Sequence, residues 1–285
     1  MEELLVNGRK EASSVLGWLS IGCWLVVYSP QLLENYQRKS GEGLSVAFII
    51  AWTLGDLFNL FGSIRAGLLP TVIILASYYT LCDLTLLVQI YYYRIFYDSH
   101  NRACAPDEST PLIPPKIDSD KPGPKKSMIV ALLERESVKY SLLALFVVCF
   151  GVLGYLRDRH PSNNTPHNDI PQDHIFEWRS QLMGWASAIL YLGARIPQIA
   201  KNLKTRCEGL SLALFLFAIS GNTFFVLSVC TISLDWEYIR VNASWLVGSG
   251  FCVFADVYIL VQFFRFRIAD RERLAAARVE NNSSA

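Results

Sequence analysis

Apolar residues fall in seven long blocks along the chain, and polar stretches separate these blocks. About twenty apolar residues in a helix, at about 1.5 Å of rise per residue, cross the roughly 30 Å hydrocarbon core of a bilayer. The pattern therefore predicts an all-α membrane protein with one transmembrane helix per block. The predicted spans are residues 14–33, 44–64, 71–93, 138–156, 180–200, 210–233 and 241–264.

The first three blocks recur as the last three, which indicates an internal duplication. The recurring elements are Pro30-Gln31 with Pro197-Gln198, Glu42-Gly43-Leu44-Ser45 with Glu208-Gly209-Leu210-Ser211, and Asp83 with Asp256. Three helices plus one bring the second copy into the membrane in the same orientation as the first. We therefore expect two parallel three-helix repeats that the fourth helix joins, a 3+1+3 arrangement.

The positive residues separate by side of the membrane. One set of alternate loops holds 18 Lys and Arg and the other set holds seven. Cytosolic loops carry the excess of positive charge, so the N-terminus is expected in the lumen and the C-terminus in the cytosol. The expected segments are a lumenal N-terminus (1–13), the first repeat (14–93), a disordered cytosolic linker (94–137), a connector helix (138–156), a lumenal loop (157–178), the second repeat (179–266) and a cytosolic tail (267–285).

Two short motifs lie outside the repeats. In the linker, Glu108 stands four residues before Leu112-Ile113, the spacing of an acidic dileucine signal that sorting adaptors read. A chance match in a polar linker is the alternative. In the lumenal loop, Asn163 begins an Asn-X-Thr sequence, so it is a predicted glycosylation site.

Each Pro-Gln dyad lies late in a predicted membrane helix. Proline removes a backbone hydrogen bond and clashes with the preceding turn, so Pro30 and Pro197 predict kinks. Gln31 and Gln198 follow them directly and can supply the hydrogen bonds that the freed carbonyls lose. A symmetric pair of such breaks favours two hinges over two static kinks.

Three carboxyl groups, those of Asp56, Asp83 and Asp256, lie inside predicted spans. A carboxylate there is costly and normally faces the bundle interior or an aqueous cavity. We interpret all three as candidates to bind a cationic substrate or a proton; a permanently protonated, structural Asp is the alternative for each. Further candidates for this site are Asn59, Asn222, Tyr79 and Trp245.

Apart from Lys139 at the very edge of a span, Arg195 is the one basic residue inside a predicted span, little more than a turn from its cytosolic end. A long basic side chain near a helix end commonly extends to the interface, so snorkelling is the expected arrangement. A gate, or a partner for a carboxylate, is the alternative. Metal-site spacings, phosphate loops and nucleophile–base motifs are missing from the sequence, so we expect no enzyme, metal, cofactor or nucleic-acid partner.

The two Pro-Gln dyads, each followed by Gly-Leu-Ser, resemble the signature of the PQ-loop family of seven-helix transporters. Within it, the likeness is strongest to the lysosomal and vacuolar cationic amino acid transporters, and the long linker is similar to that of fungal vacuolar members. The matching stretches are Gly55-Asp56-Leu57-Phe58-Asn59-Leu60-Phe61-Gly62, Arg195-Ile196-Pro197-Gln198-Ile199, Gly221-Asn222-Thr223 and Trp245-Leu246-Val247-Gly248-Ser249.

The resemblance implies movement of arginine and lysine, with histidine as a third candidate, between an acidic organelle and the cytosol. It also implies a multi-pass protein of the lysosomal or vacuolar membrane. From the two kinks we predict alternating access, in which the two bundles rock about Pro30 and Pro197, with protons as a candidate second substrate. A cystinosin-like, proton-coupled cystine exporter is the alternative transporter. A seven-helix nutrient sensor or receptor is the alternative class, although a receptor has no physical need for two matching halves.

Overall fold

The computed structural model describes the chain except for residues 1, 66–69, 98–135, 160–177 and 284–285. Within the described part every regular element is a helix, as the apolar blocks predict. The elements are α1 (Glu2–Val26), α2 (Ser29–Arg38), α3 (Val46–Arg65), α4 (Pro70–Tyr92), the short π-helix η1 (Tyr93–Tyr97), α7 (Glu136–Arg159), α8 (Trp178–Thr205), α9 (Leu212–Ile232) and α10 (Trp236–Ser283).

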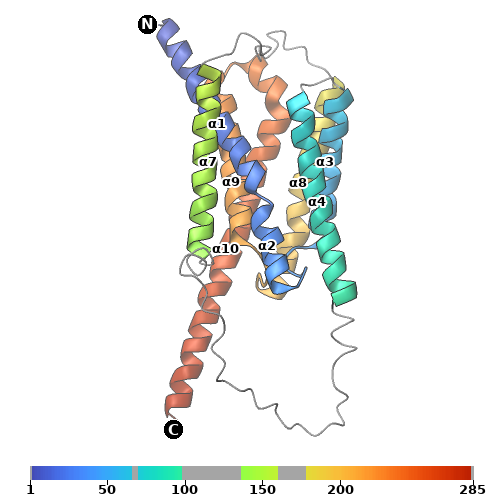
Figure 1. Cartoon of the computed structure of the whole chain (residues 1–285), viewed down its shortest axis with the longest axis vertical. Helices are drawn as coiled ribbons and strands as arrows, with labels where there is room; N and C mark the ends of the chain where they lie inside the picture. The colour runs from blue at the N-terminus through green and yellow to red at the C-terminus, as the bar shows by residue number, and fades with distance from the viewer. Residues whose placement is uncertain (1, 66–69, 98–135, 160–177, 284–285) are drawn as a thin grey trace, which may run out of the picture.

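These helices lie side by side along the long axis of the molecule, and the two termini lie at opposite ends (Figure 1). In the described residues, five stretches are long and apolar enough to cross a membrane, and the apolar stretch Val46–Phe61 in α3 is shorter. α8 is less apolar because it carries buried polar side chains, among them Arg195, Gln198 and Asn202. With α1 and α2 counted as one broken helix, the described residues confirm the predicted all-α, seven-helix membrane fold.

The two copies pack across each other. The first helix of each copy lies on the second helix of the other, α1 on α9 and α8 on α3. Equivalent glycines allow both contacts: a Cβ added to Gly55 would lie 2.6 Å from the Tyr191 ring, and one added to Gly221 would lie 2.9 Å from Trp24 Nε1. The connector α7 packs on α1, at one side of the bundle (Figure 1).

The last helix is longer than the sequence predicts. α10 continues as one helix beyond the predicted span and through most of the predicted tail, and it extends past the other helices in Figure 1. The tail is rich in Ala, Arg and Glu, which favour helix. Near the point where α10 leaves the bundle, the guanidinium of Arg206 donates to Asp270 from Nε at 3.0 Å, which ties the tail to the turn after α8.

The sorting motif and the glycosylation acceptor lie outside the described residues. These are Glu108, Leu112 and Ile113 in the linker and Asn163 in the loop after α7.

Candidate functional site

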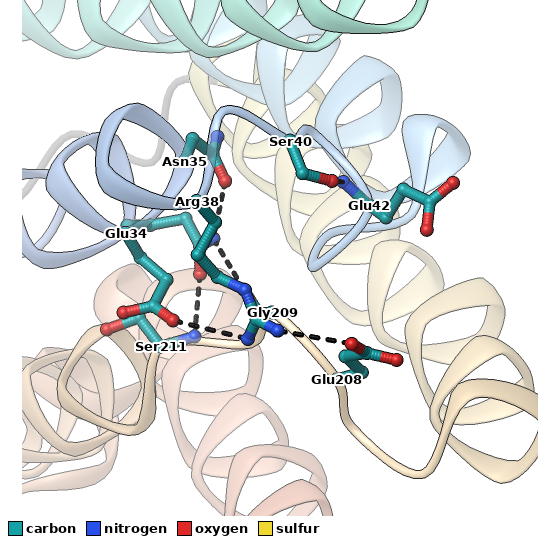
Figure 2. Close-up of polar contacts among 9 residues, drawn as sticks. Glu34, Asn35, Arg38, Ser40, Glu42, Glu208, Gly209 and Ser211 are labelled. Atoms are coloured by element: carbon teal, nitrogen blue, oxygen red, sulfur yellow. Dashed lines mark hydrogen bonds and ion pairs between the residues drawn. The ribbon is translucent and has the colours of Figure 1, made fainter. Parts of the chain in front are cut away.

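The first Pro-Gln dyad contacts the loop of the second copy. Gln31 Nε2 donates to the carbonyl of Gly209 at 3.1 Å, and Gln31 Oε1 accepts a hydrogen bond from the amide of Ser211 at 2.8 Å. Figure 2 shows Gly209 and Ser211 of this loop near Asn35 and Arg38 of α2. The loop that follows α8 is therefore attached to the helix that begins the first copy.

The second dyad makes the same contact in reverse. Gln198 Nε2 donates to the carbonyl of Gly43 at 3.2 Å, and Gln198 Oε1 accepts from the amide of Ser45 at 2.6 Å. Between these two contacts the loop backbones touch, because a Cβ on Gly43 would lie 1.8 Å from the carbonyl oxygen of Gly209. We call the two reciprocal contacts the cross-repeat clamps; together they interlock the two halves at the end of the bundle where α2 lies.

One sequence expectation about the glutamines is wrong. They do not replace the hydrogen bonds that the prolines remove, because the opposite copy engages both of them. The carbonyl of Val26, four residues before Pro30, accepts instead from the hydroxyl of Ser29 at 2.8 Å. The two kinks are also unequal: the helix is interrupted between α1 and α2, whereas α8 runs through Pro197 without a break.

A chain of amides holds each glutamine in place. In the first copy Gln31 donates to Asn35 at 2.8 Å, Asn35 donates to Gln89 at 3.2 Å, and Gln89 donates to the carbonyl of Leu32 at 3.1 Å. The third helix of the copy thereby fixes the orientation of its dyad. The equivalent chain in the second copy is Gln198, Asn202, Gln262 and the carbonyl of Ile199.

An ion pair adds to the first clamp only. Arg38 Nη2 lies 3.2 Å from Glu208 Oε1 across the halves, and Arg38 Nη1 lies 3.6 Å from Glu34 Oε1 on its own helix (Figure 2). Arg38 and Glu208 are exposed and Glu34 is partly buried, and exposed ion pairs contribute between about 0 and 1 kcal/mol. The buried amides, not this ion pair, carry most of the stability of the clamps.

Deeper in the bundle, Asp56 on α3 accepts hydrogen bonds from tyrosine hydroxyl groups of both copies. Tyr28 donates to Asp56 Oδ2 at 3.1 Å, and Tyr191 donates to Asp56 Oδ1. Asn59, one turn further along α3, donates to the Tyr191 hydroxyl at 2.5 Å. Asp56 is only 4% exposed, so its carboxyl group is sealed from solvent in this conformation.

Asp83 on α4 lies beside this group but is left without donors. It is 0% exposed, and neither of its carboxyl oxygens accepts a hydrogen bond from any described residue. It lies close enough to Asp56 and Tyr28 to interact with both electrostatically and to share a proton with the Asp56 carboxyl group. A buried polar group without a partner costs about 1–3 kcal/mol, and more when it is charged.

Asp256, at the equivalent place on α10, is neutralised from within the protein. Arg195 donates to it from Nε at 3.0 Å and from Nη2 at 3.1 Å. The guanidinium also lies over the rings of Trp52 and Phe48, 5.2 Å and 5.6 Å from their centroids. Arg195 is 2% exposed, so the snorkelling expected from the sequence is wrong. Although Arg195 lies near the helix end, its side chain pairs with the carboxylate on α10 instead of extending to the interface.

The remaining sequence candidates divide between the core and the surface. The ring of Tyr79 lies 6.3 Å from that of Tyr28, within the same core. Asn222 is buried on α9, at the position equivalent to Asp56. Trp245 is 37% exposed and lies beside Gly184 on α8.

Tyr191 and Tyr28 are site residues that are not among the sequence candidates, and Tyr191 could have been found. Two signals pointed to it: it stands 167 residues after Trp24, as Arg195 stands after Tyr28, and it precedes Arg195 by one helical turn. Residues four apart share a helix face. The structure uses this spacing directly, because Arg195 Nη1 donates to the carbonyl of Tyr191 at 2.8 Å.

The family model described as "PQ loop repeat" matches residues 12–72 and 180–238. The chain is 37% identical to a vacuolar lysine transporter of Saccharomyces cerevisiae, over 91% of this chain and 94% of the relative. This chain belongs to the PQ-loop family. A vacuolar histidine transporter of the same yeast is 35% identical over 95% of this chain and 97% of its own length. A human lysosomal amino acid transporter homologue is 30% identical over 93% and 86%.

The two matched ranges of this PQ-loop protein contain both dyads and both clamps, so the interlocked loops belong to the repeat itself. Asp56 and Asn222 also lie inside these ranges, whereas Asp83 and Asp256 lie beyond them on the third helix of each copy. The relatives are named as transporters, which agrees with the expectation that this protein is not an enzyme.

Proposed function

We propose that this PQ-loop protein moves the cationic amino acids lysine, arginine and histidine across a vacuolar or lysosomal membrane. The observation that carries the proposal is the unequal charge of the two halves. Arg195 neutralises the carboxylate of Asp256, whereas Asp56 and Asp83 have only hydroxyl donors or none. A passing cation offsets that buried charge. The names of the relatives support this substrate class, because one relative is named a lysine transporter and another a histidine transporter.

Transport proceeds by alternating access. The three carboxyl groups are at most 4% exposed, so a substrate reaches them only after the helices move. Pro30, Gln31, Pro197 and Gln198 form the proposed hinges, because the dyads link each moving half to the other. The distribution of Lys and Arg places the clamped end in the cytosol. In this arrangement the clamps close the cytosolic side, and their release opens it.

The orientation and the other partners belong to the same proposal. The N-terminus faces the acidic lumen and the C-terminus the cytosol, as the positive-inside rule favours. Protons are a second passenger, which Asp56 and Asp83 accept. Sorting adaptors read the linker motif at Glu108, Leu112 and Ile113, and Asn163 carries a glycan. Membrane lipid surrounds the helices.

Uptake into proteoliposomes tests the substrate class. The purified chain is reconstituted, and the entry of labelled lysine, arginine, histidine and cystine is followed under imposed voltage and pH gradients. We expect flux of the cationic amino acids that follows the voltage, and none in protein-free vesicles. Flux of cystine alone contradicts the proposal and supports the cystine exporter, whereas binding without any flux supports a receptor.

A further inference from the structure

We propose that Asp83 holds the side-chain cation of the substrate, and that Arg195 on Asp256 shows how that cation sits. The inference rests on the proposed transport of cationic amino acids. It assigns one cation site to the protein, in the first half, and it explains why the second half has none.

Asp83 and Asp256 occupy equivalent places in the two copies. Each lies on the third helix, six residues before a glutamine, and these glutamines anchor their copies in the same way. Gln89 accepts from Asn35 as Gln262 accepts from Asn202, both at 3.2 Å. The common anchor sets the register of α4 and α10, so the two carboxyl groups correspond.

The position that faces this carboxyl group differs between the copies. Arg195 stands 167 residues after Tyr28, in the same place relative to the dyad. In the second half, the guanidinium satisfies both oxygens of Asp256. In the first half a phenol replaces it. A phenol has one proton to donate and no charge, and Tyr28 donates that proton to Asp56.

Asp83 therefore lacks the cationic partner that its counterpart Asp256 has in Arg195. It is fully buried, and both of its oxygens are without a donor among the described residues, whereas Asp56 already accepts from two tyrosines. The protein itself supplies a cation at one of the two equivalent positions. The substrate supplies it at the other.

Aromatic rings lie near both positions. Trp52 and Phe48 flank the guanidinium of Arg195. Around Tyr28 the core is also aromatic: Tyr79 lies 6.3 Å from it, and Trp24 lies 6.1 Å from Tyr79. Aromatic faces attract cations within about 6 Å. A cation that comes beside these rings gains this attraction, which a neutral group of the same shape does not.

Binding of arginine and citrulline to the purified full chain in lipid nanodiscs tests the assignment. Citrulline has the shape of arginine without its side-chain charge. We expect the wild-type protein to bind arginine at least tenfold more tightly than citrulline, and Asp83→Asn to reduce this preference below threefold. Asp235→Asn, the same change in the exposed turn before α10, is expected to keep the wild-type preference. An Asp83→Asn variant that still prefers arginine tenfold overturns the assignment.

A second pair of variants keeps the test decisive if Asp83→Asn does not fold. Tyr28→Arg places a resident guanidinium where Arg195 has one, and Tyr28→Gln removes the phenol without adding charge. We expect arginine to bind at least tenfold more weakly to the arginine variant than to the glutamine variant. Equal affinities overturn the assignment. Failure of the wild-type protein to bind or transport any cationic amino acid overturns the proposed function itself, so the two failures are distinguishable.

Discussion

Gln198 accepts a hydrogen bond from the backbone amide of Ser45 at 2.6 Å, across 153 residues of sequence. Ser45 lies in the loop of the first copy and Gln198 in the dyad of the second, and Gln31 repeats the contact with Ser211. The glutamine of each dyad therefore links the two halves of the protein by hydrogen bonds. Its side chain provides both a donor and an acceptor, which matches one free carbonyl and one free amide in the opposite loop.

Removal of one clamp destabilises the protein. In Gln198→Ala the buried amide of Ser45 and the carbonyl of Gly43 both lose their hydrogen-bond partner. Each buried group that stays without a partner costs about 1–3 kcal/mol of stability, because water does not reach it. We expect a lower Tm in a thermal unfolding measurement in detergent. Gln37→Ala, an exposed glutamine on α2, serves as the matched control and is expected to leave Tm within the error. Equal Tm values for the two variants contradict the importance of the clamp.

The contact between the loops tolerates no side chain at Gly43. In Gly43→Ala the new Cβ would lie 1.8 Å from the Gly209 carbonyl oxygen, so the loops must separate. We expect a loss of Tm and weaker closure of this end, measured as faster labelling of Cys207 by a water-soluble thiol reagent. Gly250→Ala is the control, because a Cβ there meets nothing within 4 Å. Slow labelling in Gly43→Ala, equal to that of the wild type, argues against closure by the clamps.

We expect the loss of one charge of the Arg195–Asp256 pair to destabilise the protein more than the loss of both. Arg195→Met leaves a buried carboxylate without its cation, which typically costs about 3–5 kcal/mol. The double variant Arg195→Met with Asp256→Leu removes both charges, so we expect it to unfold at a higher temperature than Arg195→Met alone. A double variant less stable than either single variant refutes the coupling. The measurement is a double-mutant cycle of Tm values.

The hydrogen bond from Tyr191 to Asp56 leads to a prediction about the proposed transport. Tyr191→Phe removes the donor to Asp56 Oδ1 and the acceptor for Asn59. A hydrogen bond to a charged group contributes about 1.5–3 kcal/mol, so we expect arginine uptake to fall by about tenfold or more. Tyr78→Phe, whose hydroxyl donates to the carbonyl of Leu25 at 2.6 Å, is the matched control and is expected to transport arginine normally. Equal loss in both variants indicates a general structural effect.

The sequence by itself determined the membrane fold and its symmetry. Hydrophobicity over about twenty residues is a local property, and it placed the helices before any contact was known. The duplication gave the 3+1+3 arrangement and singled out the dyads and the intramembrane carboxyl groups. It also showed where the copies differ, at Tyr28 against Arg195 and Asp56 against Asn222.

Only the tertiary structure decided what these residues do to one another. The partners that Gln31, Gln198 and Arg195 find outside their own helices lie from 61 to 180 residues away in sequence, so no local pattern selects these contacts. The side chain of an arginine near a helix end can extend to the interface or pair with a buried carboxylate. The distance from Arg195 to Asp256, which decides between the two, cannot be derived from the sequence. The structure places that carboxylate within reach, and the attraction between two desolvated charges in a medium of low dielectric decides the outcome.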